Sequence, residues 1–302
     1  MISVIVLSKN NGDTLDACLK SIIDSFGDKE IIVVDAVSTD NTPKILEKYE
    51  GKIKVVYDKG KGIGIARNIG VSHSNGEIIC FVDADAICAK DHFVKIKEYF
   101  DEHPNTGIIN VVPEEKISGE IPYVQKLEAQ IRLIRRMERS IVGGSLLATG
   151  YFMAFRRKVY NDVNGFWEFP PFGADDNDFT LRALAKGWKF ASIKLESWHR
   201  HRPTLRALLK EMWMLGKGKA CFIAKWRNHP LIKVGYKHSL LTRLLGTDPI
   251  YLTIVAHVFS PFIGLKYAIR GKSLSLIPFY IVRQYTYLLG FLWGLGTWAK
   301  KL

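Results

Sequence analysis

Two aspartates that follow a short apolar run are well suited to hold a metal ion. The run is Ile78 to Val82, and the pair is Asp83 and Asp85. Carboxylates at alternate positions after a buried strand can leave the sheet edge on one side, where their oxygens bind Mg²⁺ or Mn²⁺. Two close carboxylates repel one another, and a bound cation removes that repulsion. Because such triplets are also common in solvated loops, their surroundings decide between the two interpretations.

Polar residues also follow two other apolar runs. Ser8 and Asn10 come after the first run, and Asp35 comes after the second. Ligands of an open α/β sheet bind beyond the carboxyl ends of its strands. We therefore expect these side chains to converge with Asp83 and Asp85 on one polar crevice.

A glycine-rich segment, residues 60–68, leads into a predicted helix and contains Lys61, Arg67 and Asn68. It is not a dinucleotide fingerprint, because Arg67 stands at the third glycine position and the segment does not follow the first strand. Such a turn suits contact with phosphate or a nucleoside. The alternative is a simple turn and helix cap.

Three aspartates cluster at Asp175, Asp176 and Asp178. Their mutual repulsion raises the pKa of one member, which suits a general base. Acids also stabilise a helix N-terminus, which is the alternative. Farther on, His199 and His201 could ligate a metal or donate hydrogen bonds. A basic surface turn is the alternative there, and the sequence does not rank the two histidines.

Short runs rich in Ile and Val alternate with amphipathic stretches, which predicts βαβ units. A helix is expected to start at Thr42, with Pro43 at its first turn. The fold class is therefore α/β, with a mostly parallel sheet flanked by helices. The expected strands are residues 3–7, 30–34, 53–57, 77–82 and 106–112.

The composition indicates a globular chain with a substantial core, since 47% of its 302 residues are hydrophobic. Its four cysteines have neither disulfide-framework nor zinc-ligand spacing, which favours a reducing, intracellular setting. The N-terminus lacks the pattern of a secretory signal.

The net charge of +13 is confined to the last third, where residues 201–302 hold 16 basic and two acidic residues. Interleaved apolar segments, 250–269 and 274–298, favour an anionic membrane surface over nucleic acid as the partner. Because His257, Pro261 and Arg283 interrupt them, we expect helices that lie flat or re-enter. Buried soluble helices are the alternative. A basic amphipathic helix is expected over 205–224, for which a solvated face is the alternative.

Several ordered blocks in the first 200 residues resemble the family 2 glycosyltransferases, which are inverting enzymes with the GT-A nucleotide-sugar-binding fold. The blocks are SVIVLSKNNGDTLDACLKSI, VVDAVSTDNT, GIGIARNIGVSHSNGEIICFVDADA, GYFMAFRRKVYNDVNGFWE and GADDNDFTLRALAKG. The first three resemble the opening strand and helix, the uridine loop and the metal motif. The last two resemble the acceptor-side block.

The resemblance implies a role for several aspartates. Asp35 would contact the nucleobase, Asp83 the donor ribose or the metal, and Asp85 the metal. Asp176 would be the general base, although Asp175 stands where the family usually has Glu, so either could hold that role. The implied cofactor is Mn²⁺ or Mg²⁺, and the implied donor carries UDP or GDP.

The resemblance also implies a domain organisation. Residues 1–200 would form the catalytic domain, with a nucleotide-sugar half over 1–112 and an acceptor half over 113–200. Residues 201–248 would be a basic helical segment, and 249–302 membrane-associated helices. We expect a lipid-linked or glycan acceptor and a location on the cytoplasmic side of the cell membrane.

Two other functions remain open at this point. One is a non-catalytic nucleotide-binding module on a membrane surface, which would not need the carboxylates of both motifs. The other is a sugar nucleotidyltransferase, which would be expected to carry a glycine-rich basic loop after the first strand, where this chain has SKNNGDT.

Overall fold

The computed structural model describes residues 1–114, 121–142, 152–169, 172–232 and 248–302. The chain divides into two compact units. The first comprises Met1–Glu114, Leu147–Pro171 and Asp175–Arg200, and the second comprises Glu115–Leu146, Phe172–Ala174 and His201–Leu302. The division differs from a single cut after residue 200, because residues 115–146 belong to the helical second unit.

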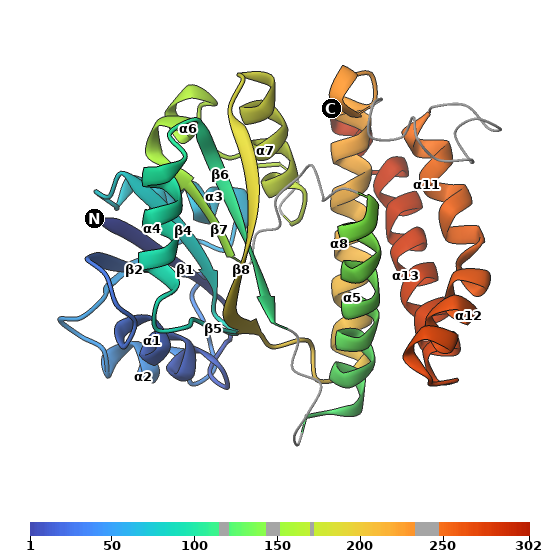
Figure 1. Cartoon of the computed structure of the whole chain (residues 1–302), viewed down its shortest axis with the longest axis horizontal. Helices are drawn as coiled ribbons and strands as arrows, with labels where there is room; N and C mark the ends of the chain where they lie inside the picture. The colour runs from blue at the N-terminus through green and yellow to red at the C-terminus, as the bar shows by residue number, and fades with distance from the viewer. Residues whose placement is uncertain (115–120, 143–151, 170–171, 233–247) are drawn as a thin grey trace. The chain divides into compact units, whose positions relative to one another are not determined.

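The first unit is built on an eight-stranded mixed sheet, shown in Figure 1. Its strands in spatial order are β3 (Lys54–Tyr57), β2 (Lys29–Asp35), β1 (Ile2–Ser8), β4 (Ile78–Asp83), β7 (Phe152–Arg156), β6 (Thr106–Glu114), β8 (Lys189–His199) and β5 (Ala86–Ile87). Within it β7 runs antiparallel to β4 and β6, and β5 antiparallel to β8. The remaining described pairings are parallel, so most strands end at the same edge.

Helices cover both faces of this sheet. Successive residues of a strand point to opposite faces, so the apolar residues of the strands must be buried on both. Val4 and Val6 of β1 pack with α1, α2 and α4, whereas Ile5 packs with α3, α6 and α7. Each face therefore carries its own hydrophobic cluster. The helix bounds are α1 (Leu15–Ile23), α2 (Thr42–Glu47), α3 (Ile63–Ser72), α4 (His92–Glu102), α6 (Arg157–Asp162) and α7 (Asp175–Ala185).

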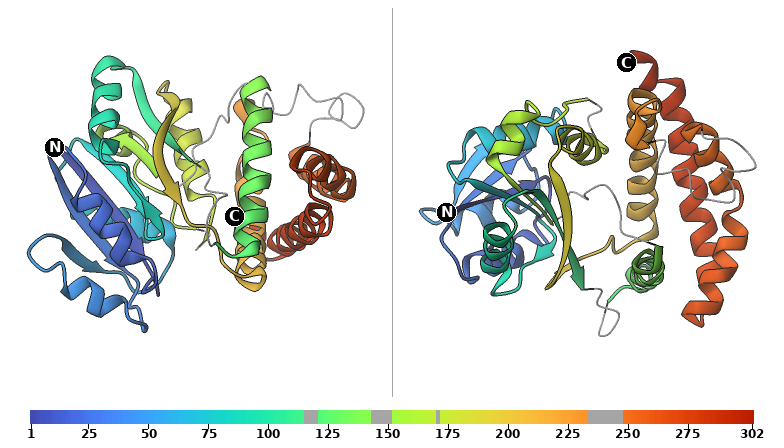
Figure 2. Two further views of the ribbon diagram at one scale, coloured as in Figure 1. Left: turned by 60° about the horizontal axis from the view of Figure 1, so that its bottom comes forward. Right: turned by 45° about the horizontal axis from the view of Figure 1, so that its top comes forward.

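The second unit is helical, and Figure 2 shows its helices from two further sides. Residues of α5, α8, α12 and α13 share one hydrophobic cluster, which includes Ile131, Met212, Tyr267 and Tyr280. The helix bounds are α5 (Tyr123–Val142), α8 (Leu205–Trp226), α11 (Pro249–Val258), α12 (Ser260–Gly271) and α13 (Leu276–Gly296). A short 3₁₀ helix, Ala299–Lys301, follows α13.

The apolar segments of the C-terminal third do not form a single spanning helix within the described residues. One bent pair, α11 and α12, meets the length and hydropathy requirements of a span, with a bend of 58°. The break lies beside Pro261, which is in the first turn of α12 and has no N–H to continue the preceding ladder.

Arg283, which interrupts the second apolar segment, lies in a buried ion pair of the second unit. Its Nε lies 2.8 Å from Glu128 Oε2, and both side chains are over nine-tenths buried. Arg132 Nε donates to the other oxygen of the carboxylate. Although burial raises the pKa of Glu128, the two guanidinium groups hold it far below its ordinary value.

We expect Arg283→Met to lower the free energy of unfolding by about 3–5 kcal/mol, because it leaves Glu128 buried without its main partner. The double variant Glu128→Met with Arg283→Met should recover most of that loss. Since the pKa of Glu128 is depressed on folding, the stability from the pair is present above pH 4.5 and lost as the pH falls. Urea unfolding measures these changes, and an unaltered midpoint for Arg283→Met would contradict them.

Candidate active site

Asp83, Asp85 and His199 form a cluster at the edge where β4 and β8 both end. The potential ligand atoms of the three side chains lie within 4.8 Å of one another. The chain brings them together because β5, directly after Asp85, pairs with the end of β8, placing Ala86 opposite His199. The N–H of Arg200 also donates to the Asp85 carbonyl at 2.9 Å.

The geometry of this cluster suits a divalent cation. His199 Nε2 lies 3.0 Å from Asp85 Oδ1 and 3.5 Å from Asp83 Oδ2. Burial lowers the pKa of His199, but the carboxylates of Asp85 and Asp83 outweigh it and raise the pKa to about 10. The imidazolium thus offsets one of the two carboxylate charges, which leaves the cluster with a net negative charge that a cation can compensate. Two hard carboxylates with one imidazole form a donor set suited to Mn²⁺, so the residues fit the cofactor that the sequence implies.

Two predicted donor-binding residues, Asp35 and Asn10, form hydrogen bonds in the loops after β1 and β2. Asp35 is buried and accepts hydrogen bonds from the N–H and the hydroxyl of Ser38 at 2.8 and 2.6 Å. Asn10 accepts from the N–H of Thr39 at 2.8 Å. Both side chains therefore order the loops after β1 and β2, and a nucleobase contact by Asp35 would share these bonds.

Ser8 ends β1 with a buried hydroxyl that has no hydrogen-bond partner within the described residues. A buried polar atom of this kind needs an explanation, such as a ligand that is not in the structure. The neighbouring register positions are Asp35 on β2 and, one residue back, Asp83 opposite Leu7. The orphaned hydroxyl thus lies at the same strand edge as the acidic pair.

Asp58 is a strand-end carboxylate that the sequence interpretation missed. It follows β3, is buried, and accepts the N–H of Gly60 at 2.9 Å. It therefore fixes the start of the glycine-rich segment, where Gly60 has a φ of 63°. The available signal was its position directly after KVVY, equivalent to that of Asp35 after the preceding strand. Lys61, in the same segment, is exposed.

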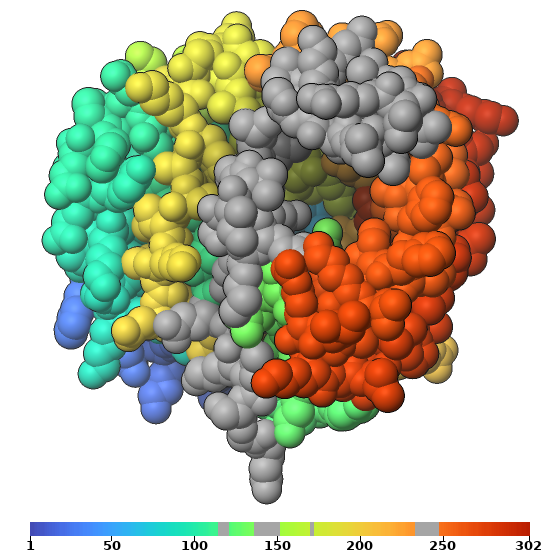
Figure 3. All heavy atoms as spheres, turned by 45° about the vertical axis from the view of Figure 1, so that its right-hand side comes forward, coloured from blue at the N-terminus to red at the C-terminus, as the bar shows by residue number. Residues whose placement is uncertain are grey.

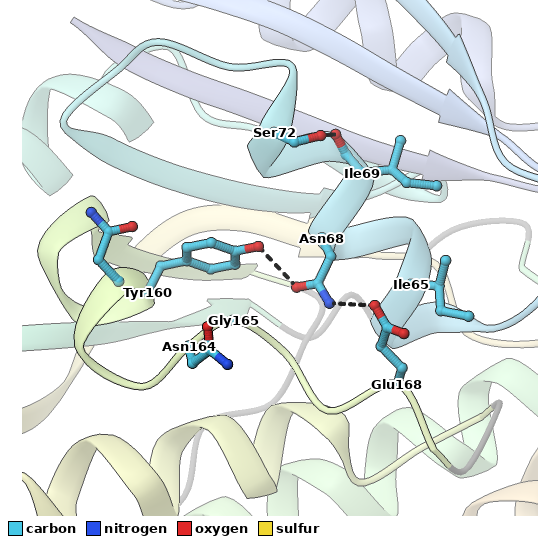
Figure 4. Close-up of a pocket in the computed structure, with 9 residues that line it drawn as sticks. Ile65, Asn68, Ile69, Ser72, Tyr160, Asn164, Gly165 and Glu168 are labelled. Atoms are coloured by element: carbon cyan, nitrogen blue, oxygen red, sulfur yellow. Dashed lines mark hydrogen bonds between the residues drawn. The ribbon is translucent and has the colours of Figure 1, made fainter.

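Arg67 and Asn68 face different surroundings, because adjacent residues of a helix point about 100° apart. Arg67 is buried, and its Nη1 donates to Asp175 Oδ2. Asn68 lines an open groove of about 560 Å³ beside the loop after α6 (Figure 4). The amide of Asn68 accepts from Tyr160 and donates to Glu168, as Figure 4 shows.

These positions differ from the expectation that both residues contact the donor. The amide of Asn68 also accepts from the Phe166 N–H and donates to the Phe166 carbonyl, so both of its ends are engaged by residues 160–168. The guanidinium of Arg67 is turned into the protein, where its Nη1 donates to Asp175 Oδ2. We therefore assign both side chains to the support of neighbouring segments.

The acidic cluster forms the first turn of α7, and its three members have different environments. Asp175 and Asp178 are buried, whereas Asp176 is half-buried. Burial raises the pKa of Asp175, Arg67 opposes that rise, and the charge of Asp176 adds to it. Because only residues 186–188 separate α7 from β8, the helix runs back along β8. Its first turn is the end directed toward the edge where β8 ends.

The two predicted histidines also separate. His199 clusters with Asp83 and Asp85, as described above, and His201 does not. His201 is a buried residue of the second unit, where its carbonyl accepts a hydrogen bond from Gln125 Nε2. His199 is therefore the histidine that the structure favours as a metal ligand.

The comparison with known families gives a direct match. The model of glycosyl transferase family 2 matches residues 3–163, which is more than half of the chain. The chain belongs to this glycosyltransferase family. It is therefore a glycosyltransferase, with an α/β mixed sheet and flanking helices of the GT-A type.

Curated relatives of this glycosyltransferase are similar over part of their length. A poly-beta-1,6-N-acetyl-D-glucosamine synthase from Staphylococcus epidermidis is 25% identical over 196 residues, which is 62% of this chain and 45% of the relative. A cholesterol galactosyltransferase from Borreliella burgdorferi is 38% identical over 88 residues, 28% of this chain and 25% of the relative. The chain thus spans less than half the length of these two relatives.

Solved structures share the fold. The mannosyltransferase PcManGT from Pyrobaculum calidifontis, in complex with GDP-Man and Mn²⁺, has a TM-score of 0.62 at 19% identity, covering 95% of this chain and 86% of the other. Glucosyl-3-phosphoglycerate synthase from Mycobacterium tuberculosis, in complex with Mn²⁺, UDP and phosphoglyceric acid, has a TM-score of 0.50 at 21% identity, covering 74% and 76%.

Proposed function

We propose that this glycosyltransferase moves a sugar from a nucleotide-sugar donor, with UDP as the first choice of nucleotide, to an acceptor hydroxyl with inversion at the anomeric carbon. The observation that carries the proposal is the meeting of Asp83, Asp85 and His199 at the carboxyl edge of the sheet. The orphaned hydroxyl of Ser8 at the same edge supports a ligand there. Complexes of structural neighbours with Mn²⁺ and a nucleotide add further support.

The cluster of Asp83, Asp85 and His199 supplies the donor side of the reaction. A divalent cation held by Asp83, Asp85 and His199 would stabilise the charge that grows on the diphosphate as the sugar leaves. For His199 to act as a ligand, its imidazole must release the proton that the two carboxylates otherwise stabilise. Cation binding should therefore release a proton.

The first turn of α7 supplies the base. We assign this role to Asp176, because it is half-buried, whereas Asp175 and Asp178 are buried in ion pairs with Arg67 and Arg182. Asp176 would accept the proton of the acceptor hydroxyl as that oxygen attacks the anomeric carbon from the face opposite the nucleotide. A single displacement of this kind inverts the anomeric configuration.

We also propose a membrane-surface location on the cytoplasmic side and a lipid-linked or polysaccharide acceptor. The surface composition of the second unit supports the contact with a membrane. Its C-terminal helices, whose surface Figure 3 shows in orange and red, contain no acidic residue from 249 to 302. Phe262 and Ile269 on α12 are 71% and 70% exposed, and Lys266 and Arg270 lie exposed between and beside them. Exposed apolar groups with basic neighbours are typical of helices that lie on anionic bilayers.

We expect the protein to sediment with vesicles that contain phosphatidylglycerol and to bind neutral phosphatidylcholine vesicles more weakly, because Lys266 and Arg270 would contact anionic headgroups. The double variant Phe262→Ser with Ile269→Ser should partition at least about 10-fold less, since two apolar side chains no longer enter the interface. Phe26→Ser, which changes a 58% exposed phenylalanine of the first unit, is the matched control. Equal sedimentation of all three proteins would contradict this location.

A donor panel tests the proposed transfer. The full chain is incubated with Mn²⁺ and each of several UDP- and GDP-sugars, with and without short-chain polyprenyl-phosphate sugars as acceptors, and nucleotide release is followed. One donor should be turned over, faster with a suitable acceptor. Pyrophosphate-dependent synthesis of a nucleotide sugar, without transfer, would indicate the nucleotidyltransferase instead.

A further inference from the structure

Arg67 lies in an unusual environment for a charged side chain. It is 5% exposed, with its guanidinium carbon 5.3 Å from the ring centre of Phe81 and 5.4 Å from that of Phe166. Its Nη1 donates to Asp175, which is 2% exposed. Arg67 Nε is buried without an acceptor in the described part of the chain. A buried ion pair that leaves a donor unsatisfied contributes little to stability, which favours a role in function.

The pair with Arg67 anchors the first turn of α7 at Asp175, and a second ion pair anchors it at Asp178. Arg182 binds Asp178, and its two Nη atoms donate to the carbonyls of Val163 and Gly165. Asp176 lies between these anchors and accepts hydrogen bonds from the N–H and amide of Asn177. The position of Asp176 therefore depends on the groups that bind its neighbours.

We propose that Arg67 and Asp175 form a positioning pair, which holds Asp176 in place and cancels the charge of Asp175 beside it. The proposal rests on the proposed function, since it takes Asp176 as the base. It assigns Arg67, in the helix that follows the glycine-rich segment, to the acceptor side of the reaction. Because α3 begins directly after the glycine-rich turn at residues 60–62 and carries Arg67, the pair also links this turn to the base.

The charge balance of the pair makes the proposal testable. Asp175→Asn leaves the Arg67 cation uncompensated beside Asp176, and an adjacent cation lowers the pKa of a carboxylate. Arg67→Met leaves Asp175 buried without its cation. Burial without a cation raises the pKa of a carboxyl, so Asp175 takes up a proton in this variant. The double variant Arg67→Met with Asp175→Asn restores a neutral pair. A merely structural contact would affect stability but not the pH dependence.

The experiment is the pH profile of kcat for nucleotide release from the donor found in the panel, for wild type, these three variants, Arg67→Lys and Asp176→Asn. We expect Asp175→Asn to move the acid limb down by about one pH unit or more and to lower kcat. The double variant should return the limb to the wild-type pH, with donor Kd unchanged throughout. Arg67→Lys, which keeps the charge, should keep the wild-type limb at a reduced kcat even if Arg67→Met does not fold.

The outcomes separate the pair from the proposed function. An acid limb that stays in place in Asp175→Asn, with normal donor binding, would overturn the positioning pair while leaving Asp176 as the base. Complete inactivity of Asp175→Asn and of the double variant, with an active Asp176→Asn, would make Asp175 the base. That result would overturn the positioning pair and the assignment of Asp176 as the base. A wild type that turns over no donor would reject the proposed function itself.

Discussion

Asp85→Asn is expected to slow nucleotide release by at least about 100-fold, the loss typical when a charge that stabilises the transition state is removed. Asp85 is 8% exposed and lies 3.0 Å from His199, so it is the most enclosed oxygen donor of the cluster. Its replacement by an amide halves the negative charge available to a cation. Turnover measured over a range of Mn²⁺ concentrations should show a weaker apparent affinity as well as a lower maximum.

Asp91→Asn is the matched control for this variant. Asp91 is a partly exposed aspartate of the same unit, whose carboxylate lies 2.5 Å from Lys95 on the surface of α4. Its replacement should leave turnover and Mn²⁺ dependence within about 2-fold of wild type, because a surface ion pair contributes at most about 1 kcal/mol. Equal activity of Asp85→Asn and Asp91→Asn would remove Asp85 from the site.

Asp176→Asn is expected to reduce transfer by about 100- to 10,000-fold, the range typical of a lost general base. An amide cannot accept the proton of the acceptor hydroxyl, so the chemical step loses its acid limb in the pH profile. The affinity for the donor should remain, because the proposed donor side is built from the ends of β1, β2 and β4 and does not include Asp176. Calorimetric titration with the nucleotide and Mn²⁺ measures that affinity separately from turnover.

The control for the base is Asp162→Asn, which lies at the end of α6 and accepts a hydrogen bond from Trp188 Nε1. The amide oxygen of asparagine can still accept that bond, so activity should be retained. If Asp176→Asn bound the donor normally and transferred sugar at the wild-type rate, another group would hold the base role.

Much of the fold could be predicted from local sequence. The strands over 3–7, 30–34 and 106–112 were expected within two residues of the observed bounds, because Ile and Val runs buried on both faces carry a strong signal. β8 was missed, because charged residues alternate along it and its side chains are partly exposed. β5 has only two residues, which no periodicity can reveal.

The site was less accessible to sequence reasoning than the fold. Asp83 and Asp85 could be named from their position after a strand, but the choice of His199 over His201 needed the pairing of β5 with β8. Arg67 was expected at the donor because a glycine-rich turn leads into its helix, but its burial against Phe81 and Phe166 depends on packing that local sequence does not reveal. Long-range contacts of this kind link residues over 100 positions apart, as Arg67 and Asp175 do.

The most direct measurement is nucleotide release from the active donor in Mn²⁺, then after EDTA, then after Mn²⁺ is restored in excess. We predict that release falls to background in EDTA and returns with the added cation, because in the proposed mechanism Asp83, Asp85 and His199 would hold the cation that stabilises the diphosphate. Turnover at the full rate in EDTA would contradict the assignment of these three residues as a catalytic metal site.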